Sequence, residues 1–227
     1  MMDWYNIALF IAHKSIISMT TLFFLYLGKE ALTTYISVLF VIANIFVIKQ
    51  IQLGGYNATG ADAFIIGVSF SINLLQEYWG KEAARKAIII SFACSALYLF
   101  MTFIHLAYLP ATFDTSQEHF VYLMQHSARI IIASFVSYTI TQTADTYLYA
   151  FTKKSTGGKF FVLRNYISMF SSQLFDTVLF SCLGLYGIVN NLLHIIVISY
   201  LIKVIAVLLS TPFMIFARKR KLAFENK

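Results

Sequence analysis

A five-residue pattern, Gln-x-x-Asp-Thr, occurs twice in the second half of this chain. The first copy contains Gln142 and Asp145, and the second, 31 positions later, contains Gln173 and Asp176. Because positions i and i+3 share one face of a helix, each copy places an amide beside a carboxylate. Amides donate and accept hydrogen bonds, and carboxylates accept them. The repeat therefore predicts a pocket in which two such pairs converge on one polar solute.

The composition is that of an integral membrane protein. Of the 227 residues, 59% are hydrophobic and only 12% are charged, whereas soluble domains carry about 25% charged residues. A carboxylate inside a membrane span costs about 2.5–3.5 kcal/mol on insertion scales, so Asp145 and Asp176 indicate a function. We predict an all-α integral membrane fold.

Seven apolar runs are long enough to cross a hydrocarbon core, which takes about 20 residues. They cover residues 4–27, 31–49, 61–80, 87–109, 121–150, 161–187 and 190–217. The first run lacks the basic start of a signal peptide and is too long for one, so we expect a retained helix. The polar, glycine-rich residues 50–60 are expected to form a solvated loop, with a re-entrant segment or a cap over a cavity as alternatives.

Connections rich in basic residues alternate along the chain with connections that lack them, as the positive-inside rule predicts for an odd number of spans. Lysines and arginines gather at 81–86, 151–164 and 218–227, whereas the intervening connections carry Asp114, Glu118 or no charge. This pattern predicts an amino terminus outside and a carboxyl terminus in the cytoplasm. It also explains the net charge of +7 without a nucleic-acid partner. Lys14 and Lys203 lie deep in spans, where each needs a partner or a watery cavity.

Three predicted spans carry polar stripes at helical spacing. The third span contains Asn73 and Glu77, the fifth contains Arg129 and the first Gln-Asp pair, and the sixth contains the second pair. Hydrogen bonds between helices explain the serines of these stripes, but they explain the charged and amide positions less well. Gln142 and Gln173 lie roughly 12–18 Å above the inner ends of their spans, near the midplane where transporter sites usually lie. A planar, guanine-like heterocycle would satisfy these groups.

Several motifs distributed along the chain carry a family resemblance. They are Ala43-Asn44, Asn73-x-x-x-Glu77-x-x-Gly80 followed by Ala84-Arg85-Lys86, Arg129-x-x-x-Ala133-Ser134-Phe135, Gln142-x-x-Asp145, Ser172-x-x-x-Asp176-Thr177 and Lys203-Val204. With these motifs, residues 40–215 resemble the queuosine-precursor transporter family, the vitamin-uptake-transporter-like proteins of six core helices. Asn73 departs from the pattern, since family members often carry an aspartate there.

The resemblance implies a fold, a location and a cargo. The fold would be a six-helix core over residues 31–217, similar to the substrate-binding subunits of energy-coupling-factor importers, with an extra amino-terminal transmembrane helix at 1–30 and a basic cytoplasmic tail at 218–227. The protein would lie in the lipid bilayer of a bacterial inner membrane and import a 7-deazaguanine such as preQ0, preQ1 or queuine, for salvage in tRNA modification. No cofactor or metal is expected. The implied substrate contacts are Asn44, Asn73, Glu77, Arg129, Gln142, Asp145, Gln173, Asp176 and Lys203.

The energy source and the oligomeric state are open at this point. Gly157-Gly158-Lys159 lacks the first glycine and the Ser/Thr of a phosphate-binding loop, so the chain itself is not expected to bind ATP. Proton coupling, facilitated diffusion and docking onto a separate ATPase all remain, and in the last case the chain would be the substrate-binding subunit of an importer for another planar heterocycle. The scattered histidines form no metal motif, and no nucleophile–base pair is visible, so we expect no enzyme. A purely structural membrane scaffold is a further alternative.

Overall fold

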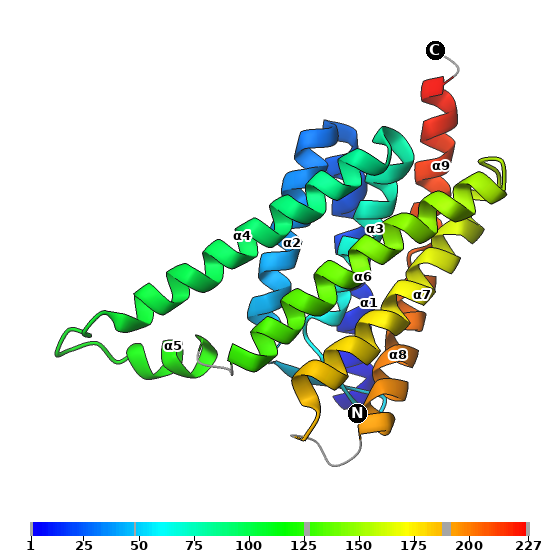
Figure 1. Ribbon diagram of the computed structural model, residues 1–227. Coiled ribbons are helices and arrows are strands. Elements are labelled where there is room, and N and C mark those ends of the chain that lie inside the picture. Colours follow the sequence, from blue (N-terminus) through cyan, green and yellow to red (C-terminus); the bar gives the residue numbers. More distant parts are fainter. Residues whose placement is uncertain (1, 48, 125–127, 188–191, 226–227) are drawn as a thin grey trace.

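The computed structural model describes residues 2–47, 49–124, 128–187 and 192–225, and nearly all of them are helical (Figure 1). The prediction of an all-α membrane protein is confirmed at this level. The elements are α1 (Met2–Leu27), α2 (Lys29–Phe46), β1 (Gln50–Leu53), β2 (Tyr56–Thr59), α3 (Asp62–Trp79), α4 (Lys81–Ala107), α5 (Gln117–Met124), α6 (Ala128–Ser155), α7 (Phe161–Phe180) with a π-helical turn (Ser181–Leu185), α8 (Leu192–Leu208) and α9 (Thr211–Glu225).

Within the described residues, five helical segments are long and apolar enough to cross a membrane. They are Trp4–Leu27, Lys29–Phe46, Lys81–Ala107, Phe161–Leu185 and Leu192–Lys219. The predicted spans at 61–80 and 121–150 correspond to α3 and α6, which carry polar stripes and do not meet that apolar criterion. α3 is instead enclosed by other helices, since 14 of its 18 residues are buried. Its polar side chains therefore face protein and not lipid.

The structure differs from the predicted spans at three places. Residues 50–59 form an antiparallel hairpin of β1 and β2, turning at Gly54 and Gly55, both of which have a positive φ as tight hairpin turns require. The predicted fifth span contains a separate short helix, α5, before α6 begins at Ala128. The last span is broken between α8 and α9, because Pro212 lacks the amide hydrogen that would continue the α8 ladder.

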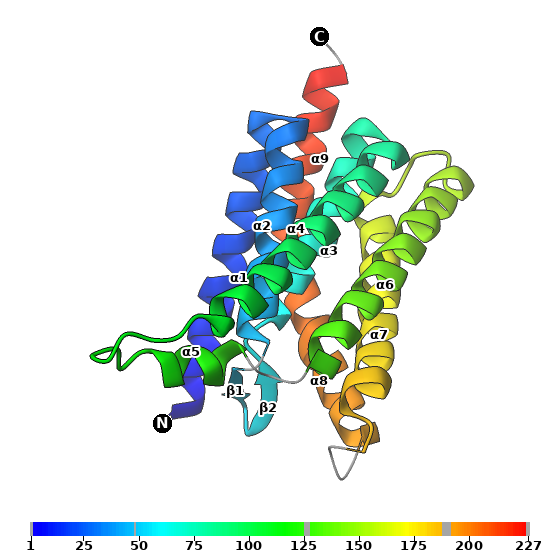
Figure 2. The ribbon, with the colours of Figure 1, turned by 60° about the vertical axis from the view of Figure 1, so that its left-hand side comes forward.

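The first helix packs directly against α3, running parallel to it. A Cβ atom placed on Gly67 of α3 would lie 2.4 Å from Cγ2 of Ile17, so only glycine permits this approach. One turn further on, the hydroxyls of Thr21 and Ser71 lie 3.1 Å apart in a hydrogen bond. α1 contacts both α2 and α3 (Figure 2). That it is an extra helix beside a six-helix core stays a prediction.

This contact predicts a compensated pair of substitutions. Gly67→Ala should lower the stability of the purified protein by about 1–3 kcal/mol, because the added methyl overpacks the interface. Ile17→Ala removes the obstructing atom. It should therefore lower stability less in the Gly67→Ala background than it does in the wild-type protein. Thermal unfolding of the four proteins in detergent measures both effects. Strictly additive losses would contradict the close approach of the two helices.

Candidate functional site

The two glutamines of the repeated pattern meet at one hydroxyl of α3. Nε2 of Gln142, on α6, donates to Oγ of Ser69 over 3.0 Å, and Nε2 of Gln173, on α7, donates to the same atom over 2.9 Å. All three residues are buried. Ser69 belongs to the polar stripe of the third predicted span, but nothing in the sequence identified it as the shared partner.

The two aspartates of the pattern point away from each other. α6 and α7 lie side by side and antiparallel (Figure 2), so the residue one turn after each glutamine is displaced in the opposite direction, by about 4.5 Å along the axis. Asp145 accepts a hydrogen bond from the Ser168 hydroxyl, while Asp176 accepts one from Lys203 over 2.9 Å. The amides converge, and the carboxylates serve two separate groups of residues.

The contact region of α3, α6 and α7 contains buried polar atoms without a hydrogen-bond partner in the described part of the chain. We call this region the polar seam; it comprises Ser69, Asn73, Gln142, Asp145, Asn165, Ser168 and Gln173. Its unpartnered atoms are Nδ2 of Asn73, Oε1 of Gln142, Oδ2 of Asp145, Oδ1 of Asn165 and Oε1 of Gln173. Buried polar groups in proteins are normally paired, so such a concentration needs an explanation. A bound solute with complementary donors and acceptors supplies one.

At one end of α3, three charged side chains form an ionic cluster. Nζ of Lys203 on α8 lies 2.9 Å from Oδ2 of Asp176 on α7 and 3.8 Å from Oδ1 of Asp62 on α3. Asp62 also accepts the amide of Thr59, which ties the β-hairpin to the same group. The sequence indicated that Lys203 needs a partner, and the structure supplies two carboxylates from different helices. Lys203 and Asp62 are buried.

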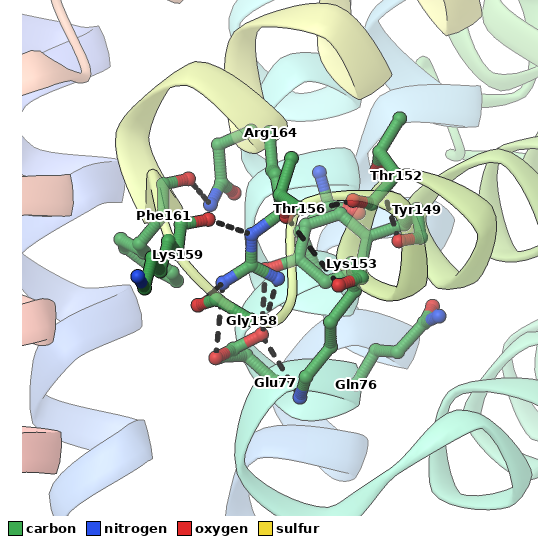
Figure 3. Close-up of polar contacts among 12 residues, drawn as sticks. Gln76, Glu77, Tyr149, Thr152, Lys153, Thr156, Gly158, Lys159, Phe161 and Arg164 are labelled. Atoms are coloured by element: carbon green, nitrogen blue, oxygen red, sulfur yellow. Dashed lines mark hydrogen bonds and ion pairs between the residues drawn. The ribbon is translucent and has the colours of Figure 1, made fainter.

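At the other end of α3, Glu77 is held by a second ionic cluster (Figure 3). Its Oε2 lies 3.0 Å from Nη1 of Arg164 and 3.1 Å from Nζ of Lys153, and it accepts a hydrogen bond from the Tyr149 hydroxyl at 3.0 Å. Arg164 is completely buried. In the sequence it belongs both to the basic 151–164 connection and to the polar stripe of the sixth span, but neither pattern identified Glu77 as its partner.

Arg164 also fixes the connection between α6 and α7. Its Nε donates to the carbonyl of Lys159 over 3.0 Å, and its Nη2 donates to the carbonyl of Gly158 over 3.1 Å (Figure 3). The connection can curl around the guanidinium because Gly157, Gly158 and Phe160 all adopt a positive φ. One arginine therefore joins this connection to the end of α3.

The remaining predicted contacts lie elsewhere. Asn44 accepts the Ser134 hydroxyl over 3.0 Å and so links α2 to α6, while its own amide donates to the carbonyl of Phe40. The side chain of Arg129 lies outside the described part of the structure. Lys14 is fully buried on α1, where Nζ donates to the Ser18 hydroxyl over 3.0 Å. Among the described residues, no group of three or more His, Cys, Asp or Glu side chains could hold a metal ion.

Comparison with known proteins places this geometry in a family context. The family model described as "Putative vitamin uptake transporter" matches residues 59–217, which include α3, the polar seam and both ionic clusters. A curated protein of Bacillus subtilis (strain 168), "Probable queuosine precursor transporter", is 31% identical over 201 residues, covering 87% of this chain and 88% of that protein. No solved structure matches the chain.

Loss of the arginine should lower stability strongly in the buried Arg164–Glu77 pair and only slightly in the exposed Arg85–Glu82 pair. Arg164→Met leaves Glu77 buried without its main partner and should lower stability by about 3–5 kcal/mol. Arg85→Gln breaks a pair with Glu82 whose side chains are 50% and 75% exposed, at 3.4 Å, and should change stability little. Thermal unfolding of both variants in detergent tests this contrast. Equal losses would show that the Glu77 cluster does not hold α3 to the α6–α7 connection.

Proposed function

The chain belongs to the vitamin uptake transporter family, and we propose that it imports a queuosine precursor, a 7-deazaguanine, into the cytoplasm. The observation that carries this proposal is the convergence of Gln142 and Gln173 on Ser69, with both of their carbonyl oxygens unpartnered. The name of the Bacillus subtilis relative supports the class of cargo.

The polar seam is complementary to the edges of a guanine-like ring. The ring amine and ring N–H groups are donors, for which the unpartnered oxygens of Gln142 and Gln173 are acceptors. The ring carbonyl is an acceptor, for which Nδ2 of Asn73 is an available donor. In this proposal the solute replaces the hydrogen bonds that these buried atoms lack, and it lies between α3 and the α6–α7 pair.

The other residues implied by the family resemblance stay predicted contacts. Asp176 is paired with Lys203, and Glu77 is paired with Arg164. A substrate can therefore bind either carboxylate only by displacing a cationic side chain. In our proposal these two ionic clusters hold the ends of α3 while the seam between them binds the cargo. Asn44 supports α6 through Ser134.

We further propose the fold relationship and the orientation that the sequence indicates. The six predicted spans between residues 31 and 217 would correspond to the core of energy-coupling-factor substrate-binding subunits, in a bacterial inner membrane. The alternation of basic connections favours an amino terminus outside and a carboxyl terminus in the cytoplasm. A fluorescent protein fused to the carboxyl terminus should accordingly fold and fluoresce, and a dark fusion at normal abundance contradicts this orientation.

Loss of one seam amide should abolish most of the uptake. Gln173→Leu removes both the bond to Ser69 and the unpartnered oxygen, and the loss of such a buried partner costs about 1–3 kcal/mol. Uptake of a labelled 7-deazaguanine by cells that make the variant should therefore fall about tenfold or more at equal membrane abundance. Glu82→Gln, on the exposed face of α4, is the matched control and should transport normally. Unchanged uptake by Gln173→Leu would remove the basis of the proposed site.

The alternative is a substrate-binding subunit that depends on a separate ATPase. We expect the purified protein alone, reconstituted into liposomes, to admit the labelled compound without nucleotide, because the family model and the relative's name both describe a transporter. Accumulation that appears only after addition of an ATPase module and ATP would favour the alternative. A pH gradient imposed across the same liposomes distinguishes proton coupling from facilitated diffusion.

A further inference from the structure

The interior carboxylates of this protein are unequally neutralised. Asp62 and Asp176 share Lys203, at 3.8 and 2.9 Å, and Glu77 has Arg164 and Lys153, at 3.0 and 3.1 Å. Asp145, which is 2% exposed, has no basic side chain within ion-pair distance among the described residues.

Along α6, Asp145 lies 16 residues from Arg129, or about 24 Å along the helix axis. Within the described residues, no basic side chain neutralises Asp145.

The hydrogen bonds around Asp145 leave one oxygen available. Oδ1 accepts the hydroxyl of Ser168, while Oδ2 has no partner in the described residues. A flat amidine-like edge pairs best with a carboxylate that offers both oxygens. A single available oxygen suits a compact, rotatable donor such as an ammonium group.

Two neighbours of Asp145 are also acceptors, while Asn73, which shares the Ser168 hydroxyl with Asp145, has an unpartnered donor, Nδ2. Gln142, one turn earlier on α6, and Asn165, one turn from Ser168 on α7, each have an unpartnered carbonyl oxygen. With a neutral ligand the buried carboxyl is either protonated or carries an uncompensated charge that costs several kcal/mol, whereas a cationic ligand pairs with the carboxylate. The surrounding oxygens would accept the remaining hydrogens of the ammonium group.

We propose that Asp145 is the counter-ion for a protonated amine on the transported molecule, an inference that rests on the function proposed above. Among 7-deazaguanines, the site selects those with an aminomethyl substituent on the ring over those with a neutral substituent. The two glutamines hold the heterocycle at the level of Ser69, and Asp145 lies one turn away, about 4.5 Å, within reach of such a substituent. Asp145 is thus a specificity-determining residue.

The test compares two ligands of the same shape that differ in charge. Binding of 7-aminomethyl-7-deazaguanine and 7-hydroxymethyl-7-deazaguanine to the purified full-length protein is measured by calorimetry for wild type, Asp145→Asn and the surface control Glu82→Gln. Wild type and control should bind the amine about tenfold or more tightly than the alcohol. Asp145→Asn, which keeps the shape and removes the charge, should lose most of this preference while its affinity for the alcohol changes by less than about threefold.

The outcomes separate this inference from the proposed function. Equal affinity of wild type for the two compounds overturns the counter-ion role and leaves the transporter proposal standing, and this comparison does not depend on the folding of any variant. If folded Asp145→Asn still prefers the amine to the alcohol, the counter-ion role of Asp145 is overturned as well. If wild type binds neither compound, the proposed function and this inference both fail.

Discussion

α3 carries polar and charged side chains along its whole length inside a bundle of apolar helices, and each of these groups needs a partner. A membrane interior offers no water to hydrogen-bond with them, so the partners must come from neighbouring helices or from a ligand. α1 supplies Thr21 for Ser71, α8 supplies Lys203 for Asp62, and α7 supplies Arg164 for Glu77. The requirement to satisfy α3 explains why so many helices surround it and why glycine is needed where α1 approaches.

These contacts divide the interior into two ends where charged side chains are paired and a centre where buried polar atoms lack partners among the described residues. At both ends of α3, opposite charges are in contact and reach across three elements, which fixes helices that would otherwise slide past one another. Between them, the glutamines meet at Ser69 with their carbonyl oxygens unpartnered, and Asp145 has one unpartnered oxygen. The carboxylates at both ends therefore have cationic partners, while in our proposal the acceptors at the centre bind a donor-rich solute.

Sequence periodicity was sufficient to locate most of the helices, because long apolar runs have few other structures available in a membrane. It could not predict the hairpin at 50–59, where two glycines with positive φ turn a polar segment back on itself, nor the break that Pro212 imposes between α8 and α9. Both features depend on a few backbone positions and leave average hydropathy almost unchanged.

For the repeated Gln-x-x-Asp pattern as well, the sequence predicted one part of the arrangement and missed another. The spacing indicated correctly that each pair lies on one face, and the structure brings the glutamines together. The opposed directions of α6 and α7 separate the aspartates, a consequence of antiparallel packing that the pattern alone did not reveal. The sequence assigned Arg164 to a basic connection and to the polar stripe of the sixth span, and only the fold shows that the connection curls around it and buries it against Glu77.

The most direct test of this account is an experimental structure of the protein with 7-aminomethyl-7-deazaguanine bound. The account predicts the ring between α3, α6 and α7, with hydrogen bonds to the side-chain oxygens of Gln142 and Gln173 and the amine beside Oδ2 of Asp145. A ligand bound elsewhere, with these oxygens still unpartnered, would contradict it.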